Sequence, residues 1–147
     1  MCFARVVACC LLCAALSACA VHRPAADEHA GSPALEDLTG RVYHLVSMDG
    51  QRLACGNTPE LGFTGEGRVF GSACNRFSGA AKIVNGTLTA KNAAATRMAC
   101  AQPVLNDLEK IVFGMLENGA QIRLDGNRLM LARDGHTLVY ELPSPKP

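Results

Sequence analysis

Cysteine and histidine are the residues of this sequence that could do nucleophilic, redox or metal-binding chemistry. Eight cysteines occur in 147 residues; five fall within the first nineteen positions, and the rest are Cys55, Cys74 and Cys100. None of these three forms a C-x-x-C pair, the usual motif of a disulfide oxidoreductase. No short Cys/His spacing presets a tetrahedral zinc site either. The sequence therefore predicts no redox motif, no bound metal and no cofactor.

Hydrolytic chemistry has equally little support. A cysteine nucleophile needs a base oriented on its thiolate. The folded part contains only His44 and His136, each in a predicted strand on a face turned to solvent. A Ser/His/Asp triad lacks its G-x-S-x-G elbow. We expect no catalytic residues. The alternative, a cysteine-dependent enzyme, would need a free thiol of Cys74 or Cys100 within hydrogen-bond reach of a histidine.

The N-terminal segment has the features of a lipoprotein export signal. Arg5 precedes an apolar run over residues 6–16, which is shorter than the roughly 20 residues that span a bilayer. The run ends in a tetrapeptide that resembles the lipobox at which bacterial lipoprotein precursors are acylated and cut, Leu16-Ser17-Ala18-Cys19. We expect residues 1–18 to be a cleaved lipoprotein signal peptide and Cys19 to carry the lipid. An ordinary signal peptide ending at Ala18, or a buried apolar helix, is the alternative.

The expected anchor suggests a location and a class of partner. Two or three acyl chains hold a protein stably on a membrane, whereas one does so only marginally. Ala20 follows the cysteine in place of aspartate, which by resemblance to the usual Gram-negative sorting pattern favours the outer membrane, with the domain facing the periplasm. Without Arg5 the 14 basic residues become 13, equal to the 13 acidic ones. Binding of nucleic acid, which needs clustered cations, is therefore not expected.

The elements that must position these residues are mostly strands. Residues 19–36 are rich in Ala, Pro and charge without periodicity, which predicts a flexible tether; residues 37–142 form the domain and 143–147 a tail. Alternation with a period of two runs through 41–48 and recurs along the domain. Asn85-Gly86 joins 81–84 to 87–89 in the clearest hairpin signal. The C-terminal segment predicts a three-stranded meander with these inward residues: Ile122, Leu124, Leu129, Leu131, Leu138 and Tyr140.

One segment has helical periodicity instead. Over 103–118 the apolar residues recur at intervals of three and four, as in Val104, Leu108, Ile111 and Met115. Pro103 suits the first turn of a helix, and Gly119 suits the left-handed position just past its end. We therefore expect an α+β fold that is mainly antiparallel β: a barrel-like or strongly curved sheet of about seven to eight strands with one amphipathic helix.

Three blocks of the sequence resemble a known family. They are Gly71-Ser72-Ala73-Cys74-Asn75-Arg76-Phe77-Ser78-Gly79, Asn85-Gly86-Thr87-Leu88-Thr89 and Thr96-Arg97-Met98-Ala99-Cys100. Together with Glu109 and residues 118–121, they look like the signature of the META domain, in its branch of HslJ-like heat-shock lipoproteins. The resemblance covers residues 38–142. It implies a compact antiparallel β domain with one helix, an envelope lipoprotein tied to heat or drug tolerance, and no assigned catalytic residues. Two departures are Tyr43, where the family often has tryptophan, and the additional Cys55.

The three later cysteines allow three single disulfide bridges in an oxidising compartment, each leaving one thiol over. The family resemblance favours Cys74 with Cys100, because both lie in its blocks. Closing this 26-residue separation would stabilise the domain by about 3–4 kcal/mol in the loop-entropy model. Cys55 is then the candidate free thiol, and we expect it to be buried, since free cysteine behaves as a small hydrophobe. The alternative is an exposed thiol that is available for a mixed disulfide.

The signature blocks also supply the candidate binding residues Asn75, Arg76 and Arg97. Asn75 is a natural turn former whose amide can satisfy local backbone groups. The two arginines could receive a carboxylate or phosphate of an envelope partner if they share one surface, although solvated or internally paired arginines are more common. The leading hypothesis is a non-enzymatic lipoprotein whose domain binds a protein or another envelope component during stress. The alternative is a small-molecule or lipid-binding β-barrel with an apolar interior cavity.

Overall fold

The computed structural model describes residues 31–53 and 58–144, and a single curved antiparallel sheet dominates them. Within these ranges the sheet has 11 strands. In chain order the strands are β1 (Val42–Met48), β2 (Gln51–Arg52), β3 (Glu60–Thr64), β4 (Arg68–Ser72), β5 (Arg76–Ala80), β6 (Lys82–Val84), β7 (Thr87–Thr89), β8 (Ala94–Ala95), β9 (Ala120–Asp125), β10 (Arg128–Arg133) and β11 (His136–Glu141). The helices are α1 (Leu35–Leu38) and α2 (Pro103–Asn118).

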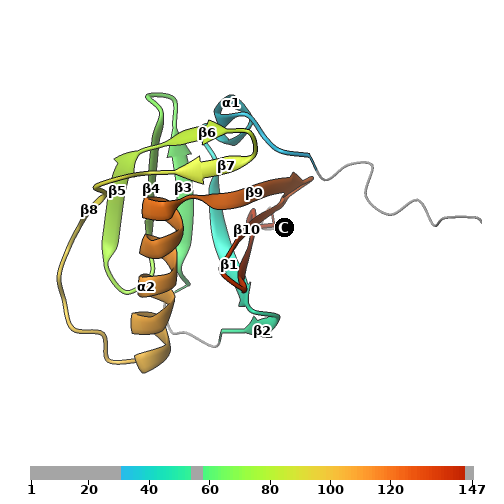
Figure 1. Cartoon of the computed structure of the whole chain (residues 1–147). Coiled ribbons are helices and arrows are strands. Elements are labelled where there is room, and N and C mark those ends of the chain that lie inside the picture. The colour runs from blue at the N-terminus through green and yellow to red at the C-terminus, as the bar shows by residue number, and fades with distance from the viewer. Residues whose placement is uncertain (1–30, 54–57, 145–147) are drawn as a thin grey trace, which may run out of the picture.

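The strands follow the order β6-β7-β9-β10-β11-β1-β3-β4-β5-β8, with β2 paired to β1 off this path. Short turns join β3 to β4, β6 to β7, and β9 through β11, whereas β1 joins the two halves by pairing with both β3 and β11. Asn85 and Gly86 have φ of 48° and 71°, as the predicted type I′ turn requires. The sheet curls strongly (Figure 1), which confirms the predicted mainly antiparallel, curved fold.

The helix α2 begins and ends at the residues that the sequence predicted. Pro103 occupies its first turn, where the missing N–H costs nothing. Its apolar face packs into the concave side of the sheet (Figure 1) through the buried side chains of Leu108, Val112, Met115 and Leu116. Gly119 ends the helix with φ of 91° but ψ of 131°, so it is not in the left-handed helical region that we expected.

The core fills the concave side of the sheet. Its largest buried side chains include Tyr43, Phe63 and Tyr140, and five of the six residues predicted to face inward in the meander are buried; Leu124 is half-buried. Burial raises the pKa of Tyr140, because the phenolate would lose its hydration. The concave side of the sheet is therefore lined by packed, mostly apolar side chains.

Two predictions about the organisation of the domain need correction. The 11 strands of the described residues exceed the expected seven to eight, in part because β2 and β8 contain two residues each, too few for alternation to be read. The tether prediction extended to residue 36, but Gly31 exchanges two backbone hydrogen bonds with Leu124 on β9, of 3.2 and 3.0 Å. Residues 31–36, which were part of the predicted tether, are therefore ordered against the domain.

Several other predictions fall outside the described residues. These concern the signal peptide, the lipidation of Cys19, the tether up to residue 30, the environment of Cys55 and the last three residues of the tail. Among the residues that the structure does describe, no helix combines the length and the apolar character needed to cross a membrane.

Candidate binding cleft

A single asparagine organises the turn between β4 and β5. Asn75 is 4% exposed and is the one buried polar residue in the described part of the chain. Its Oδ1 accepts hydrogen bonds from the Met98 N–H (2.8 Å) and the Thr96 hydroxyl (3.0 Å). Its Nδ2 donates to the Met98 carbonyl oxygen (3.2 Å) and to the Glu109 carboxylate (3.1 Å). Both lone pairs and both protons of this buried amide are therefore satisfied.

Glu109 ties the same turn to the helix. Its Oε2 accepts the backbone N–H of Asn75 at 2.8 Å, in addition to the amide contact. The helical register points this side chain of α2 out of the apolar face and toward the turn. We expected the Asn75 amide to satisfy local backbone groups. That prediction is wrong, because the backbone groups that it satisfies belong to Met98, and all its nitrogen and oxygen partners lie 21 to 34 positions further along the chain.

A second fastening is covalent. Cys74 and Cys100 form a disulfide, with their Cα atoms 5.8 Å apart. Residues 96–102, which we call the strap, lead from β8 to α2 and are thus held by the disulfide, by Asn75 and by a hydrogen bond from the Thr96 N–H to the Arg76 carbonyl oxygen (3.0 Å). The strap is mostly exposed, and the Met98 side chain is 67% exposed although its backbone is fixed.

Four polar residues on neighbouring strands form a row beside the strap. The register places His44 opposite Glu60, Glu60 opposite Ser72, and Ser72 opposite Arg76. Because directly opposed residues share a face of the sheet, these side chains all lie on its outer face. The His44 Nε2 atom is 3.5 Å from the Glu60 carboxylate, with both side chains partly exposed. No ion pair of the described residues includes Arg76.

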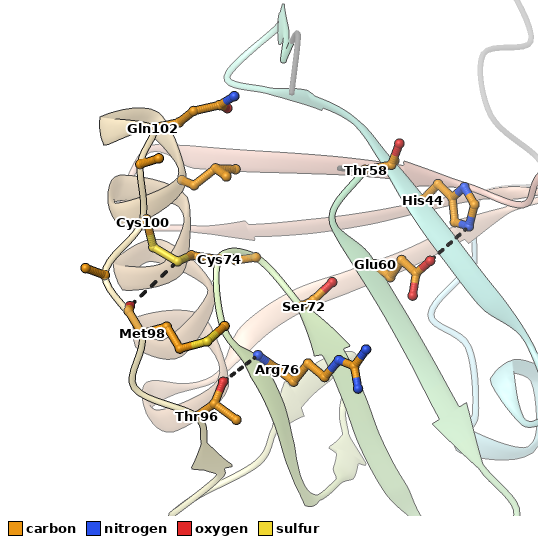
Figure 2. A pocket seen from close by; sticks show the side chains of 14 residues that line it. His44, Thr58, Glu60, Ser72, Cys74, Arg76, Thr96, Met98, Cys100 and Gln102 are labelled. Atoms are coloured by element: carbon orange, nitrogen blue, oxygen red, sulfur yellow. Dashed lines mark hydrogen bonds and ion pairs between the residues drawn. A yellow bond between two sulfur atoms is a disulfide. The ribbon is translucent and has the colours of Figure 1, made fainter. Parts of the chain in front are cut away.

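The row and the strap are the two walls of an open cleft of about 1160 Å³. Figure 2 shows the labelled polar side chains of the sheet on one side, and Met98, Cys100 and Gln102 on the other. Most of the apolar lining comes from the strap and the start of α2, through Met98, Ala99, Ala101 and Leu105. The disulfide lies between the two walls. The cleft therefore combines fixed charges, hydroxyl groups and a small apolar surface.

Metal binding has one geometric candidate here. The sulfurs of Cys74 and Cys100 and an oxygen of Glu109 lie within 4.8 Å of one another. Sulfur binds metals as thiolate, and a disulfide has none to offer. The oxidised protein therefore presents a structural bridge at this position.

The comparisons with known proteins agree on one family. The family model of the META domain matches residues 36–144. The chain is 44% identical over 108 residues to heat shock protein HslJ of Escherichia coli (strain K12); the match covers 73% of this chain and 77% of that protein. This chain belongs to the META domain family. The resemblance first drawn from the signature blocks, including the likeness to HslJ, is thereby confirmed.

Solved structures support the fold. One NMR structure, 43% identical, superimposes with a TM-score of 0.69 and covers 75% of this chain and 95% of its own. Another, from Burkholderia xenovorans, is 22% identical with a TM-score of 0.63, covering 84% of this chain and 95% of its own. The second likeness concerns the fold alone. Both place the present META domain among curved antiparallel sheets with a packed helix.

The predicted site residues of the META domain are only partly brought together. Arg76 lines the cleft, and Asn75 supports it from within, whereas Arg97 is exposed on the strap but does not line the cleft. His44 lines the cleft beside Glu60, while His136 lies elsewhere, with its Nδ1 atom 2.8 Å from Asp49. Cys19 and Cys55 lie outside the described residues.

Sequence reasoning missed several positions of the cleft and its support. Glu60 belongs to no motif, and Ser72 lies in a signature block but was not singled out; only the strand register shows that they share a row with Arg76. Glu109 was noted as part of the family likeness, but a glutamate on an amphipathic helix usually faces solvent. Met98 was part of a signature block, but the residue type of methionine does not indicate that this side chain is exposed. Only the pairing of the strands, which a single sequence does not reveal, would have identified these positions.

Proposed function

We propose that this META domain is a non-enzymatic, HslJ-like envelope module that binds a component of the cell envelope through the cleft and acts in tolerance of heat or drug stress. The supporting observation is that two signature blocks, 71–79 and 96–100, meet at this one surface. The buried asparagine network and the disulfide fix the backbone of an exposed strap. The domain therefore presents a surface that is already ordered before a partner binds.

The chemistry of the cleft favours binding over turnover. Cys74 and Cys100 are consumed in the disulfide, so neither supplies the thiolate that a cysteine nucleophile needs. The histidine that lines the cleft is His44. Its neighbour is the Glu60 carboxylate, and the other members of the polar row are Ser72 and Arg76. Such a row can hold and orient a polar ligand.

Photocrosslinking from two exposed apolar positions tests the proposal. Met98 is 67% exposed at the cleft, and Val84 is 62% exposed on the β6–β7 hairpin, so the two are matched in accessibility. With a photoreactive residue at either position in the full chain, we expect crosslinked products from stressed envelopes at position 98 that are lost with Arg76→Gln. Equal products from both positions, or products insensitive to Arg76→Gln, would contradict binding in the cleft.

The location is part of the proposal and needs its own test. We propose that acylation of Cys19 attaches the domain to the outer membrane on the periplasmic side. A Cys19→Ser chain should then remain unlipidated and fail to restore stress survival to a strain lacking the gene, whereas the parent chain restores it. Full restoration by the Cys19→Ser chain would show that the anchor is irrelevant to function, and an unmodified mature terminus by mass measurement would remove the anchor itself.

A further inference from the structure

The polar row of the cleft is the end of a longer charge pattern across the outer face of the sheet. Continuing from His44 away from the cleft, the register places Glu141 opposite His44 and Arg128 opposite Glu141. Arg128 and Glu141 form an ion pair of 2.8 Å. Acidic and basic side chains therefore alternate from strand to strand up to Glu60, so that each carboxylate has a basic neighbour.

The alternation breaks at Ser72. Glu60 and Arg76 lie on the strands on either side of it, two interstrand spacings or roughly 9.6 Å apart along the sheet. No ion pair joins them within the described residues. Figure 2 shows the Arg76 side chain extending from β5 toward the side on which Ser72 and Glu60 lie. The cleft thus presents an anion and a cation separated by one hydroxyl group.

We infer that the cleft binds a zwitterionic group, with the ammonium of the ligand at Glu60, its phosphate or carboxylate at Arg76, and the Ser72 hydroxyl between them. This inference rests on the proposed binding role of the cleft and names the ligand chemistry. Arg76 offers a planar fork of donors that fits phosphate or carboxylate in a bidentate manner. Glu60 can accept hydrogen bonds from an ammonium, because its side chain lines the cleft and stays 45% exposed beside its other neighbour on the row, His44.

Ligands with one charge fit the row less well. An anion on Arg76 lies close to the Glu60 carboxylate, and a cation on Glu60 lies close to the Arg76 guanidinium, so each incurs a like-charge repulsion that a zwitterion converts into attraction. The row therefore selects against singly charged molecules. Selectivity for the paired charges, rather than raw affinity, is the property that distinguishes this site.

The opposite wall indicates what the zwitterion is attached to. Met98 and Leu105 are apolar, and the strap between them adds the small side chains of Ala99 and Ala101, the disulfide-bonded Cys100 and one polar side chain, Gln102. An apolar extension of the ligand can cover these side chains, whereas a fully polar molecule would leave them in water. The shared chemistry is a zwitterionic head beside an apolar group. A phospholipid headgroup with its glycerol ester region and a free amphipathic amino acid derivative are the two sources.

Amide NMR titrations of the isotopically labelled full chain carrying Cys19→Ser test the inference. The probes are glycerophosphoethanolamine, which is zwitterionic, and glycerophosphoglycerol, which has the phosphate without the ammonium. We expect the zwitterion to perturb Ser72, Arg76 and strap amides and to bind at least about tenfold more tightly, the worth of one charge-assisted contact. Glu60→Gln should reduce this ratio to about one, and Arg76→Gln should weaken both probes. Arg97→Gln, an exposed cation outside the cleft, is the matched control.

Two further arms identify the source of the ligand. One arm uses dihexanoyl-phosphatidylethanolamine below its micelle concentration; if it binds about tenfold more tightly than its headgroup alone, the source is a lipid. The other arm uses an N-terminally free leucine derivative; if this binds more tightly, the source is a free amino acid. Either result supports the inference. Equal binding of the two glycerol probes, or a ratio unchanged by Glu60→Gln, overturns it. Absent binding of every probe, with Met98 crosslinks retained, overturns the zwitterion and leaves the binding role standing. Loss of the crosslinks as well would overturn both.

Discussion

The side-chain amide of Asn75 pairs with both backbone groups of Met98, accepting from its N–H at 2.8 Å and donating to its carbonyl oxygen at 3.2 Å. An amide side chain thereby makes the two contacts that a neighbouring strand would make. Because β8 ends before Met98, the strap at this point has no neighbouring strand, and the Asn75 amide takes its place in holding the backbone. The exposed methionine is consequently presented from a fixed backbone.

Replacing Asn75 should cost more stability than an ordinary surface change. Asn75→Ala removes the acceptor of two donors and leaves the Met98 backbone without its partner, for which we expect a loss of about 3 kcal/mol in the free energy of unfolding. Urea unfolding measures it. Asn106→Ala on the exposed part of α2 is the control and should change this free energy by less than about 0.5 kcal/mol. Similar losses in both variants would contradict the role of the Asn75 network.

Glu109 should not tolerate its isosteric amide. Both of its carboxylate oxygens accept from Asn75, so Glu109→Gln would set an NH₂ group against a donor whichever way it is turned. We expect a loss of about 1–3 kcal/mol, measured by urea unfolding. Asp107→Asn on the same helix removes only an exposed ion pair and serves as the matched control. An unchanged Glu109→Gln protein would show that one oxygen suffices.

The hydroxyl of Tyr43 is a buried polar group without a stabilising contact among the described residues. The side chain is fully buried, and its OH has no hydrogen-bond partner among the described residues. Tyr43→Phe keeps the ring and removes the unsatisfied group. We expect the thermal midpoint to stay level or rise, by the equivalent of up to about 1 kcal/mol. A clear fall in the midpoint would mean that the hydroxyl has a partner, such as an internal water molecule.

The turn after β1 should contribute stability that depends on pH. The pKa of the Asp49 carboxyl is lowered from its usual 3.8, first by the hydrogen bond with His136 and then by that from the Thr137 N–H. A lowered pKa means that the folded state favours the ionised form. This contribution is therefore present above the usual pKa and is lost as the pH falls through the lowered one.

Asp49→Asn tests this pH dependence. Unfolding free energies measured from about pH 6 downward should fall less steeply in acid for the variant than for the parent, because one linked proton is removed. Asp107→Asn provides a control at an exposed carboxylate without such contacts to the β11 turn. Parallel pH profiles of Asp49→Asn and the parent would contradict the assignment.

The sequence predicted local elements better than remote contacts. The bounds of α2 followed from one apolar face and from Pro103, and the β6–β7 hairpin followed from Asn85-Gly86, since both signals act over a few residues. The prediction of a flexible tether did not hold at Gly31, because the pairing of this residue with Leu124 depends on a strand 93 positions away.

The site was harder to predict because it depends on register. Asn75, Arg76 and the disulfide pair came from the family blocks, but the fourfold satisfaction of the Asn75 amide involves three segments that only the folded chain brings together. Glu60 and Ser72 became candidates only when the strand pairing placed them beside Arg76. Single-sequence patterns contain no such cross-strand information, since alternation fixes the face of a residue and not its neighbour.

The doubly fastened strap has a thermodynamic consequence. Flexible recognition loops lose conformational freedom when they close on a ligand, which weakens affinity and slows encounter. Here covalent and amide restraints have already removed that freedom during folding. Association at this surface should therefore resemble rigid docking, with fast on-rates and little ordering entropy, so that differences among ligands appear mainly in how quickly each one leaves.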